Sequence, residues 1–312
     1  MSEKFPAEQA PRVLFFGMQG NFSSPSLTSL LESGVDVCAV VVPASPLPGS
    51  RPPAIRRLEA PTRRPILPLV HTASSVFHIA GERHIPVWEV FTLKDAQTLS
   101  ILHEYEPDFL CVACFSLLIP PSILSLPRLG CLNVHPALLP ANRGPVPLFW
   151  TFREGDEYTG VTIHSMEEKM DSGAILSQER LAVPEGIRYK QLEVECARRG
   201  GVLLARTVWE VFKGDAQSVP QDETKSSYHS FPTDADLVVV PQEWSARHLY
   251  NFIRGVAAWN GPVELHFEDR RIFVYDATSY AVNGSDRRGE MSVASGEWIV
   301  SCKDGYVRVL LA

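Results

Sequence analysis

The 312-residue sequence contains no apolar run long enough to span a membrane, so we expect no membrane partner. Its N-terminal segment is polar and lacks the apolar centre of a secretory signal, which favours the cytoplasm as the compartment. Cysteine is sparse: six thiols are scattered along the chain, which argues against a disulfide scaffold. With 45% hydrophobic residues and a net charge of −7, the composition is typical of a globular protein in water.

Signatures of metal and nucleotide binding are also missing. Cys111 and Cys114 have C-x-x-C spacing, but no second pair accompanies them and both fall in an apolar run. Buried thiols are therefore favoured over a metal or redox site, and no metal is expected. Gly17 and Gly20 follow the first apolar strand without the G-x-G-x-x-G pattern, which favours a tight turn over a phosphate-binding loop.

What the chain does contain is an alternation of apolar strands and amphipathic helices, the pattern of a parallel α/β sheet. We therefore predict an α/β fold with a doubly wound, mostly parallel sheet in a catalytic domain over residues 1–215. In its last helix, Gly200 and Gly201 indicate either close packing or a kink. Strands are expected at 12–16, 35–42, 86–88, 109–115, 129–134 and 160–164, and helices at 24–32, 76–80, 93–105 and 188–213.

The composition changes after residue 215. Residues 216–233 are polar and predict a linker, and residues 234–312 predict a smaller second domain. Residues 221–312 hold 9 Lys and Arg against 13 Asp and Glu, a net charge of −4. A helix is expected at 245–254, and short strands joined by polar turns favour a small, open β-barrel. These strands are expected at 237–240, 263–267, 271–275, 298–301 and 307–310.

The residues with the clearest chemical pattern lie between Cys131 and Gly173. Side chains two apart on a strand point the same way, so Asn133 and His135 are expected to project together. A second strand follows, and after it a loop that presents Asp171. Histidine can move protons, an amide can donate to a developing oxyanion, and a carboxylate can orient the imidazole. Together these residues predict an acyl-transfer site.

They belong to a longer pattern that resembles the signature of the folate-dependent N-formyltransferases. The pattern runs Asn133-Val134-His135-Pro136-Ala137-Leu138-Leu139-Pro140, then Arg143-Gly144, Gly160-Val161-Thr162 and Asp171-Ser172-Gly173. Members of that family transfer a formyl group from 10-formyltetrahydrofolate to an amine. In length and order of segments the chain is most similar to the methionyl-tRNA formyltransferases, with the amino-sugar formyltransferases close behind. The resemblance implies a Rossmann-variant catalytic domain and an OB-like C-terminal domain.

The resemblance also implies roles for individual residues. Asn133, His135 and Asp171 are the expected catalytic residues. The folate is expected in an apolar slot beside a strand end, and the alternative is that its lining residues are plain core residues. The expected lining is Phe115, Leu117, Leu118, Ile119, Leu138, Leu139 and Pro140.

Contacts with the acceptor are expected from a Pro-rich loop at 43–68. In methionyl-tRNA formyltransferases a basic insertion at this place enters the acceptor end of the tRNA, and the loop here is similar in location and charge. A plain surface loop is the alternative. His164 fits a structural or a substrate-facing role equally well. The expected substrate-binding residues are Arg51, Arg56, Arg57, Arg63, Arg64 and Arg143, of which Arg143 could instead cap its own loop.

The leading hypothesis is formylation of initiator methionyl-tRNA, with 10-formyltetrahydrofolate as donor and no stable protein partner. A second hypothesis is an acceptor that is a nucleotide-linked amino sugar or another small amine, which the acidic second domain suits. A non-catalytic folate- or RNA-binding protein and a hydrolase of formyl-folate are the remaining alternatives.

Overall fold

The computed structural model describes residues 10–44, 53–59, 75–268, 270–282, 291–294 and 297–311. The chain forms two compact units that interleave along the sequence. The first comprises Met1–Pro140, Val161–Glu179 and Val194–Ser226, and the second comprises Ala141–Gly160, Arg180–Glu193 and Ser227–Ala312. The division of the sequence into a catalytic domain, a linker at 216–233 and a C-terminal domain stays a prediction.

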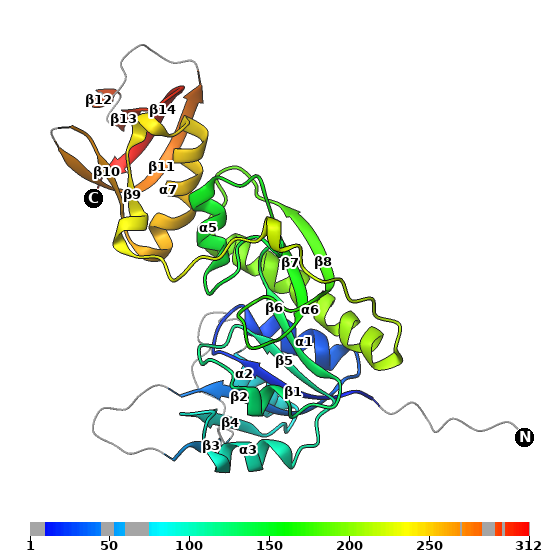
Figure 1. The fold of residues 1–312 in the computed structure, drawn as a ribbon. Helices are drawn as coiled ribbons and strands as arrows, with labels where there is room; N and C mark the ends of the chain where they lie inside the picture. Colours follow the sequence, from blue (N-terminus) through cyan, green and yellow to red (C-terminus); the bar gives the residue numbers. More distant parts are fainter. Residues whose placement is uncertain are drawn as a thin grey trace, which may run out of the picture. The chain divides into compact units, whose positions relative to one another are not determined.

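An eight-stranded sheet has the order β3-β4-β2-β1-β5-β6-β7-β8 (Figure 1). Strands β4, β2, β1, β5 and β6 pair in parallel, whereas β3 and β7 are antiparallel to their neighbours β4 and β6. The predicted α/β fold with a mostly parallel sheet is therefore confirmed. The strands are β1 Arg12–Gly17, β2 Asp36–Pro43, β3 Ile55–Leu58, β4 Val87–Val90, β5 Phe109–Ala113, β6 Gly130–His135, β7 Tyr158–Ser165 and β8 Ile175–Ala182.

Helices connect these strands, and local signals explain where several of them begin. Ser75 accepts a hydrogen bond from the His78 amide at the start of one helix, and Asp95 accepts one from the Gln97 amide at the start of another. Two further helices begin with proline in the first turn, where its missing N–H does no harm. The helices are α1 Ser23–Glu32, α2 Val76–Glu82, α3 Ala96–His103, α4 Pro121–Leu124, α5 Pro147–Glu154, α6 Tyr189–Lys213 and α7 Ala246–Asn260.

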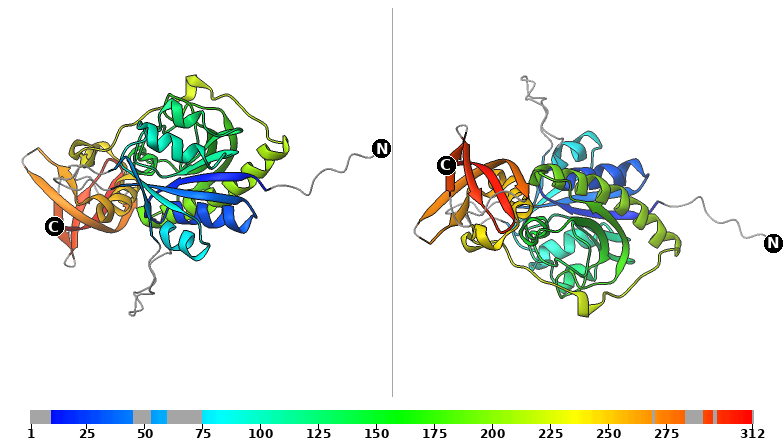
Figure 2. Two further views of the ribbon diagram at one scale, coloured as in Figure 1. Left: turned by 90° about the horizontal axis from the view of Figure 1, so that it is seen from below. Right: turned by 90° about the horizontal axis from the view of Figure 1, so that it is seen from above.

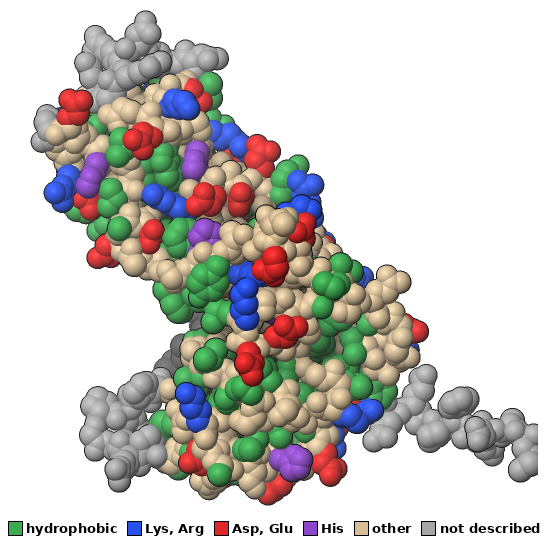
Figure 3. Space-filling view, in the orientation of Figure 1, with side chains coloured by type: hydrophobic (Ala, Val, Ile, Leu, Met, Phe, Trp, Pro, Cys, Tyr) green, Lys and Arg blue, Asp and Glu red, His purple; other side chains and the backbone are tan. Residues whose placement is uncertain are grey.

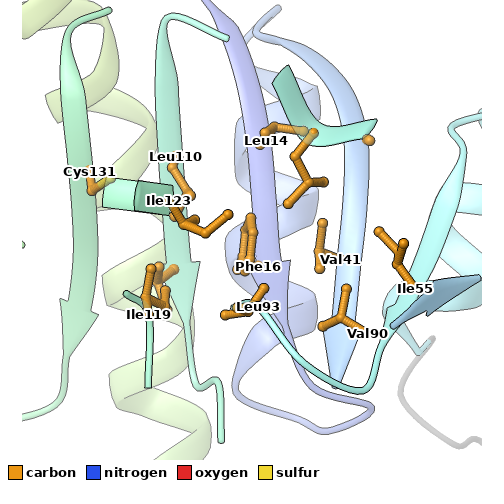
Figure 4. Packing of buried hydrophobic residues seen from close by; sticks show 13 residues of the cluster. Leu14, Phe16, Val41, Ile55, Val90, Leu93, Leu110, Ile119, Ile123 and Cys131 are labelled. Carbon is orange, nitrogen blue, oxygen red and sulfur yellow. The ribbon is translucent and has the colours of Figure 1, made fainter. Parts of the chain in front are cut away.

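The central strands are buried on both faces, as their unbroken apolar runs predict. Leu14 and Phe16 of β1 pack with Leu110 of β5 and with Ile123 of α4 on one face (Figure 4). The alternate residue Phe15 is also fully buried, and alternation along a strand places it on the opposite face.

The glycine pair in α6 permits close packing, the first of the two interpretations drawn from the sequence. A Cβ on Gly200 would lie 2.6 Å from Cγ1 of Val134, and a Cβ on Gly201 would lie 2.6 Å from the carbonyl oxygen of Pro25. One glycine thus lets α6 approach β6, and the other lets it approach the backbone of α1.

A second sheet of six strands has the order β12-β13-β14-β11-β10-β9. Its pairs are antiparallel except for β9 with β10, and α7 packs against one face over β11 and β14 (Figure 2). The two edges of this hydrogen-bonded order are β12 and β9, so the predicted smaller C-terminal β domain is present and open. Its strands are β9 Val238–Val239, β10 Val263–His266, β11 Arg271–Val282, β12 Met291–Ala294, β13 Glu297–Ser301 and β14 Gly305–Leu311.

Several local predictions were wrong. The segment expected as one loop at 43–68 contains β3, and helix α5 was not predicted. Strand β5 ends at Ala113, so Cys114 lies beyond it and is exposed rather than buried. Strands β8 and β12 were not predicted, and β11 extends to Val282. Among the described residues, every helix is too short or too polar to cross a membrane.

Candidate active site

The candidate site lies where β6 ends beside β7. These strands are antiparallel, and their register sets Asn133 opposite His164 and His135 opposite Thr162. Directly opposed residues of an antiparallel pair share a face of the sheet, and so do residues two apart on one strand. The backbone alone therefore brings these four side chains to one face.

A single carboxylate lies beside both histidines of this group. Oδ2 of Asp171 is 3.7 Å from Nδ1 of His135, and Oδ1 is 3.5 Å from Nε2 of His164. The two imidazole rings are 6.2 Å apart and nearly perpendicular. Both are buried, with His135 3% exposed and His164 1% exposed. The structure thus brings together the three residues expected to be catalytic and adds a second histidine.

The hydrogen bonds of His164 determine the orientation of the Asn133 amide. Nδ1 of His164 lies 2.8 Å from the carbonyl oxygen of Ser165, and a carbonyl only accepts, so Nδ1 carries the proton. In a neutral imidazole the other nitrogen is then an acceptor, and Nδ2 of Asn133 donates to it over 3.1 Å. With His164 neutral, its Nε2 directs the amide nitrogen of Asn133 toward β7, and Oδ1 of Asp171 lies 3.5 Å from the same ring nitrogen.

Asp171 is presented by a sharply bent loop. Its backbone lies in the left-handed region, with φ at 53°, which is uncommon for a residue other than glycine. Two residues later, a Cβ on Gly173 would lie 1.9 Å from the carbonyl oxygen of Ser165, so only glycine fits there. The loop is closed by a hydrogen bond from the Ser165 amide to the Ala174 carbonyl at 3.0 Å. Close packing against the end of β7 thus fixes the turn that carries Asp171.

The loop after His135 is held by two polar side chains, the buried Thr162 and Gln178 of β8. Oγ1 of Thr162 donates to the carbonyl of Ala137 at 2.7 Å and accepts from Nε2 of Gln178 at 2.8 Å. The same Gln178 nitrogen donates to the carbonyl of Leu139 at 2.9 Å. The Leu139 side chain is buried, while Leu138 and Pro140, its neighbours in the expected folate lining, are partly exposed.

The other half of the expected folate lining follows β5, where residues 114–120 form neither helix nor strand. Phe115 packs edge-on against Phe16, and Ile119 is buried. Leu117 is partly exposed, and Leu118 is 71% exposed, unusual for a leucine. The exposed Leu118 side chain can cover the face of a flat ring, and backbone N–H and C=O groups that belong to no helix or strand can hydrogen-bond to the polar edges of the ring. These residues fit a folate.

The expected acceptor-binding arginines differ in their surroundings. Arg56 lies opposite Glu89 in the β3–β4 pair, with Nε 2.5 Å from Oε2, and its guanidinium sits 5.5 Å from the centre of the Phe91 ring. Arg57, the next residue, is exposed. Arg51, Arg63 and Arg64 lie outside the described residues.

Arg143 is only 3% exposed and therefore belongs to the interior of its unit. Its amide donates to the Ser227 carbonyl at 3.0 Å, and its carbonyl accepts from the His229 amide at 2.9 Å. A Cβ on Gly144 would lie 2.0 Å from the His229 carbonyl oxygen, which explains the glycine beside it. Of the two alternatives for Arg143, this packing favours a role in its own loop.

Burial suppresses the reactivity of several of the thiols. None of the six cysteines is in a disulfide. Burial raises the pKa of Cys111 and raises the pKa of Cys131 to about 12. Among the described residues, no group of three or more His, Cys, Asp or Glu side chains is placed to hold a metal ion.

Comparison with known proteins supports the same chemistry. The family model for formyl transferase matches residues 12–208. The chain is 30% identical over 300 residues to methionyl-tRNA formyltransferase of Pelotomaculum thermopropionicum, covering 96% of this chain and 88% of that protein.

Solved structures share the fold. The N-formyltransferase of Helicobacter canadensis, solved with folinic acid and dTDP-3-aminofucose, has a TM-score of 0.64 and 15% identity, with 96% of this chain and 99% of that chain covered. Methionyl-tRNA formyltransferase of Clostridium thermocellum has a TM-score of 0.51 and 12% identity, with 96% and 100% covered. At these identities the similarity concerns the fold alone.

Proposed function

Since this chain belongs to the formyl transferase family, we propose that it transfers the formyl group of 10-formyltetrahydrofolate to the amino group of initiator methionyl-tRNA. The observation that carries the chemistry is the group of Asn133, His135 and Asp171, in which the buried His135 at the end of β6 lies beside the Asp171 carboxylate. The acceptor is inferred from the similarity to a methionyl-tRNA formyltransferase over almost the whole chain.

The folate supplies a formyl group on its N10 atom. The residues that would hold it are Leu118 and the backbone of residues 115–119 on one side and the loop at 138–140 on the other. Thr162 and Gln178 keep the second loop in place through hydrogen bonds to its backbone.

His135 is the proposed proton acceptor. Asp171 lies beside Nδ1, which favours the tautomer that carries its proton there and leaves Nε2 as the base for the attacking amine. Once the imidazole is protonated, the same carboxylate stabilises its positive charge. The 3.7 Å separation is that of an ion pair rather than a direct hydrogen bond.

Asn133 is the proposed oxyanion donor. Its amide nitrogen carries two hydrogens, and His164 accepts one of them. The second is available to the formyl oxygen as negative charge develops there, next to two histidines that are themselves buried.

A second candidate acceptor is an amino sugar linked to a nucleotide. The ion pair between Arg56 and Glu89 occupies one of the arginines expected to meet tRNA phosphates. On the face drawn in Figure 3, basic and acidic side chains of the described residues are interspersed rather than gathered by sign. A basic surface is what a polyanion requires, so these features favour a smaller acceptor.

The acceptor is tested by offering 10-formyltetrahydrofolate with charged initiator methionyl-tRNA and, in parallel, with a panel of nucleotide-linked amino sugars. Formylated methionyl-tRNA, formed at a rate that falls steeply with salt, supports the proposal. Formylation of an amino sugar alone contradicts the tRNA assignment and supports the second candidate.

A further inference from the structure

The segment that follows α6 contacts the loop that carries Asp171. Nε2 of Gln221 donates to the carbonyl oxygen of Asp171 at 2.8 Å and to that of Gly173 at 2.7 Å. An amide nitrogen has two hydrogens, so both are directed into the turn. We infer that Gln221 is a positioning residue for formyl transfer, because it holds the backbone from which Asp171 reaches the histidines. This inference rests on the proposed role of Asp171.

The turn at Asp171 needs such support. A left-handed backbone at a residue other than glycine is sparsely populated and persists only where its surroundings over-determine it. The two hydrogen bonds from Gln221 restrain the carbonyls on either side of Ser172. They therefore fix the peptide planes of the turn, and with them the direction of the Asp171 side chain.

Gln221 is itself held in place. Val219 and Ile175 exchange two backbone hydrogen bonds, each 2.9 Å long, so the segment pairs with the start of β8. On the other side, Nζ of Lys169 lies 3.7 Å from Oε2 of Glu223. The segment 219–223 thus contacts residue 169, which precedes Asp171, and residue 175, which follows it. All of these residues lie in one compact unit.

The geometry specifies what the loss of Gln221 does. The Asp171 oxygens lie 3.5 Å and 3.7 Å from the histidine nitrogens, so a small rotation of the turn separates them. Displacement of a reacting group by about 1 Å can cost on the order of a hundredfold in rate. Gln221→Leu should therefore lower kcat by roughly tenfold to a hundredfold while KM for the folate and the acceptor changes little.

The test compares Gln221→Leu with Asp171→Asn, with the double variant and with Gln217→Leu, a change at an exposed glutamine of the same segment. Initiator methionyl-tRNA is the acceptor probe, and the amino sugar replaces it if the wild type uses that instead. Gln221→Leu is expected to lower kcat, Gln217→Leu to leave it unchanged, and the double variant to be no slower than Asp171→Asn.

Two outcomes overturn the inference while leaving the proposed function intact. One is that Gln221→Leu matches Gln217→Leu while Asp171→Asn is slow. The other is that the Gln221→Leu effect persists undiminished in the double variant, because the residue would then act elsewhere. A fast Asp171→Asn enzyme instead overturns the proposed role of Asp171, and with it the inference.

Hydrogen exchange tests the inference without an activity assay, so it also applies to a variant whose activity is low for another reason. Hydrogen exchange of the amides at 171–175 should be faster in Gln221→Leu than in Gln217→Leu. Gln221→Glu, which keeps the shape but replaces the donor nitrogen with an acceptor oxygen, should show the same increase. Equal exchange in all of the folded variants contradicts the inference.

Discussion

Asn133 and His164 form a pair whose members depend on one another. The antiparallel register of β6 and β7 sets them opposite each other, and the Ser165 carbonyl determines which nitrogen of His164 can accept the Asn133 amide. The sequence motif identified Asn133 and left His164 undecided, because the register between two strands is not visible in either strand alone. At the scale of single residues, the account therefore makes different predictions for the two side chains.

Asn133→Ala should fold normally and turn over at least tenfold more slowly. Loss of one preorganised oxyanion donor costs on the order of 3 kcal/mol, roughly a hundredfold in rate. The measurement is kcat together with the thermal midpoint, and an enzyme of wild-type stability and near-wild-type kcat would exclude this role for Asn133.

His164→Leu should slow turnover less than Asn133→Ala does, by roughly threefold to tenfold, because it removes the acceptor that orients the amide but not the amide itself. His164→Gln, whose side-chain oxygen can accept the same hydrogen bond, is the matched variant and should be faster than His164→Leu. Equal rates for the two variants would show that the hydrogen bond to Asn133 is irrelevant to turnover.

At the scale of elements, α6 illustrates packing that local propensity opposes. Glycine weakens a helix, yet Gly201 stands where a Cβ would meet the Pro25 carbonyl oxygen at 2.6 Å. The contact between α6 and α1 thus determines the residue, and helix propensity does not.

Gly201→Ala should lower the thermal midpoint by a few degrees, because overpacking against backbone costs about 1–3 kcal/mol and exceeds the gain of about 1 kcal/mol in helix propensity. Val202→Ala, at the adjacent position that is 59% exposed, is the control and should leave the midpoint nearly unchanged. A more stable Gly201→Ala protein would contradict the packing argument.

The junction of α5 and α7 should respond to pH. Nε2 of His248 donates to the carbonyls of Phe152 and Arg153, its ring stacks on Trp244, and burial lowers its pKa from the ordinary value of 6.5. The unfolded chain then binds a proton at His248 more readily than the folded chain does. This contribution to stability is therefore complete at high pH and is lost as the pH falls below about 6.5.

Denaturant titrations between pH 8 and pH 5 check this. The free energy of unfolding of His248→Gln should fall less steeply with decreasing pH than that of the wild type. His103→Gln, at the exposed end of α3, should keep the wild-type slope. Parallel curves for the wild type and His248→Gln would contradict the account.

The elements also show what the sequence can and cannot predict. The central strands were predictable because both faces are apolar, whereas β8 contains a run of four polar residues at 177–180, which hides any alternation of apolar and polar residues in its sequence. Helix α5 was missed although Pro147 is a start signal and Gly155 ends it in the left-handed conformation. In the site, Asn133, His135 and Asp171 were predictable from their order. Gln221 was not, because its partner Asp171 is 50 residues away.

At the scale of the whole molecule, the residues proposed for the chemistry are confined to one compact unit. Asn133, His135, His164, Asp171 and Gln221 all lie in the unit that contains most of the eight-stranded sheet. The second unit contains the smaller sheet and belongs mainly to the acidic part of the chain. The proposed chemistry and the choice of acceptor are therefore separate questions that call for separate measurements.

The central claim is that His135 accepts the proton of the attacking amine, supported by Asp171. Its most direct test is single-turnover formyl transfer by the wild type and by His135→Gln, with enzyme in excess over the acceptor that the wild type uses. General-base catalysis contributes roughly a hundredfold or more, so His135→Gln should bind the folate normally and transfer at least about a hundredfold more slowly. Transfer by His135→Gln at close to the wild-type rate would contradict the account.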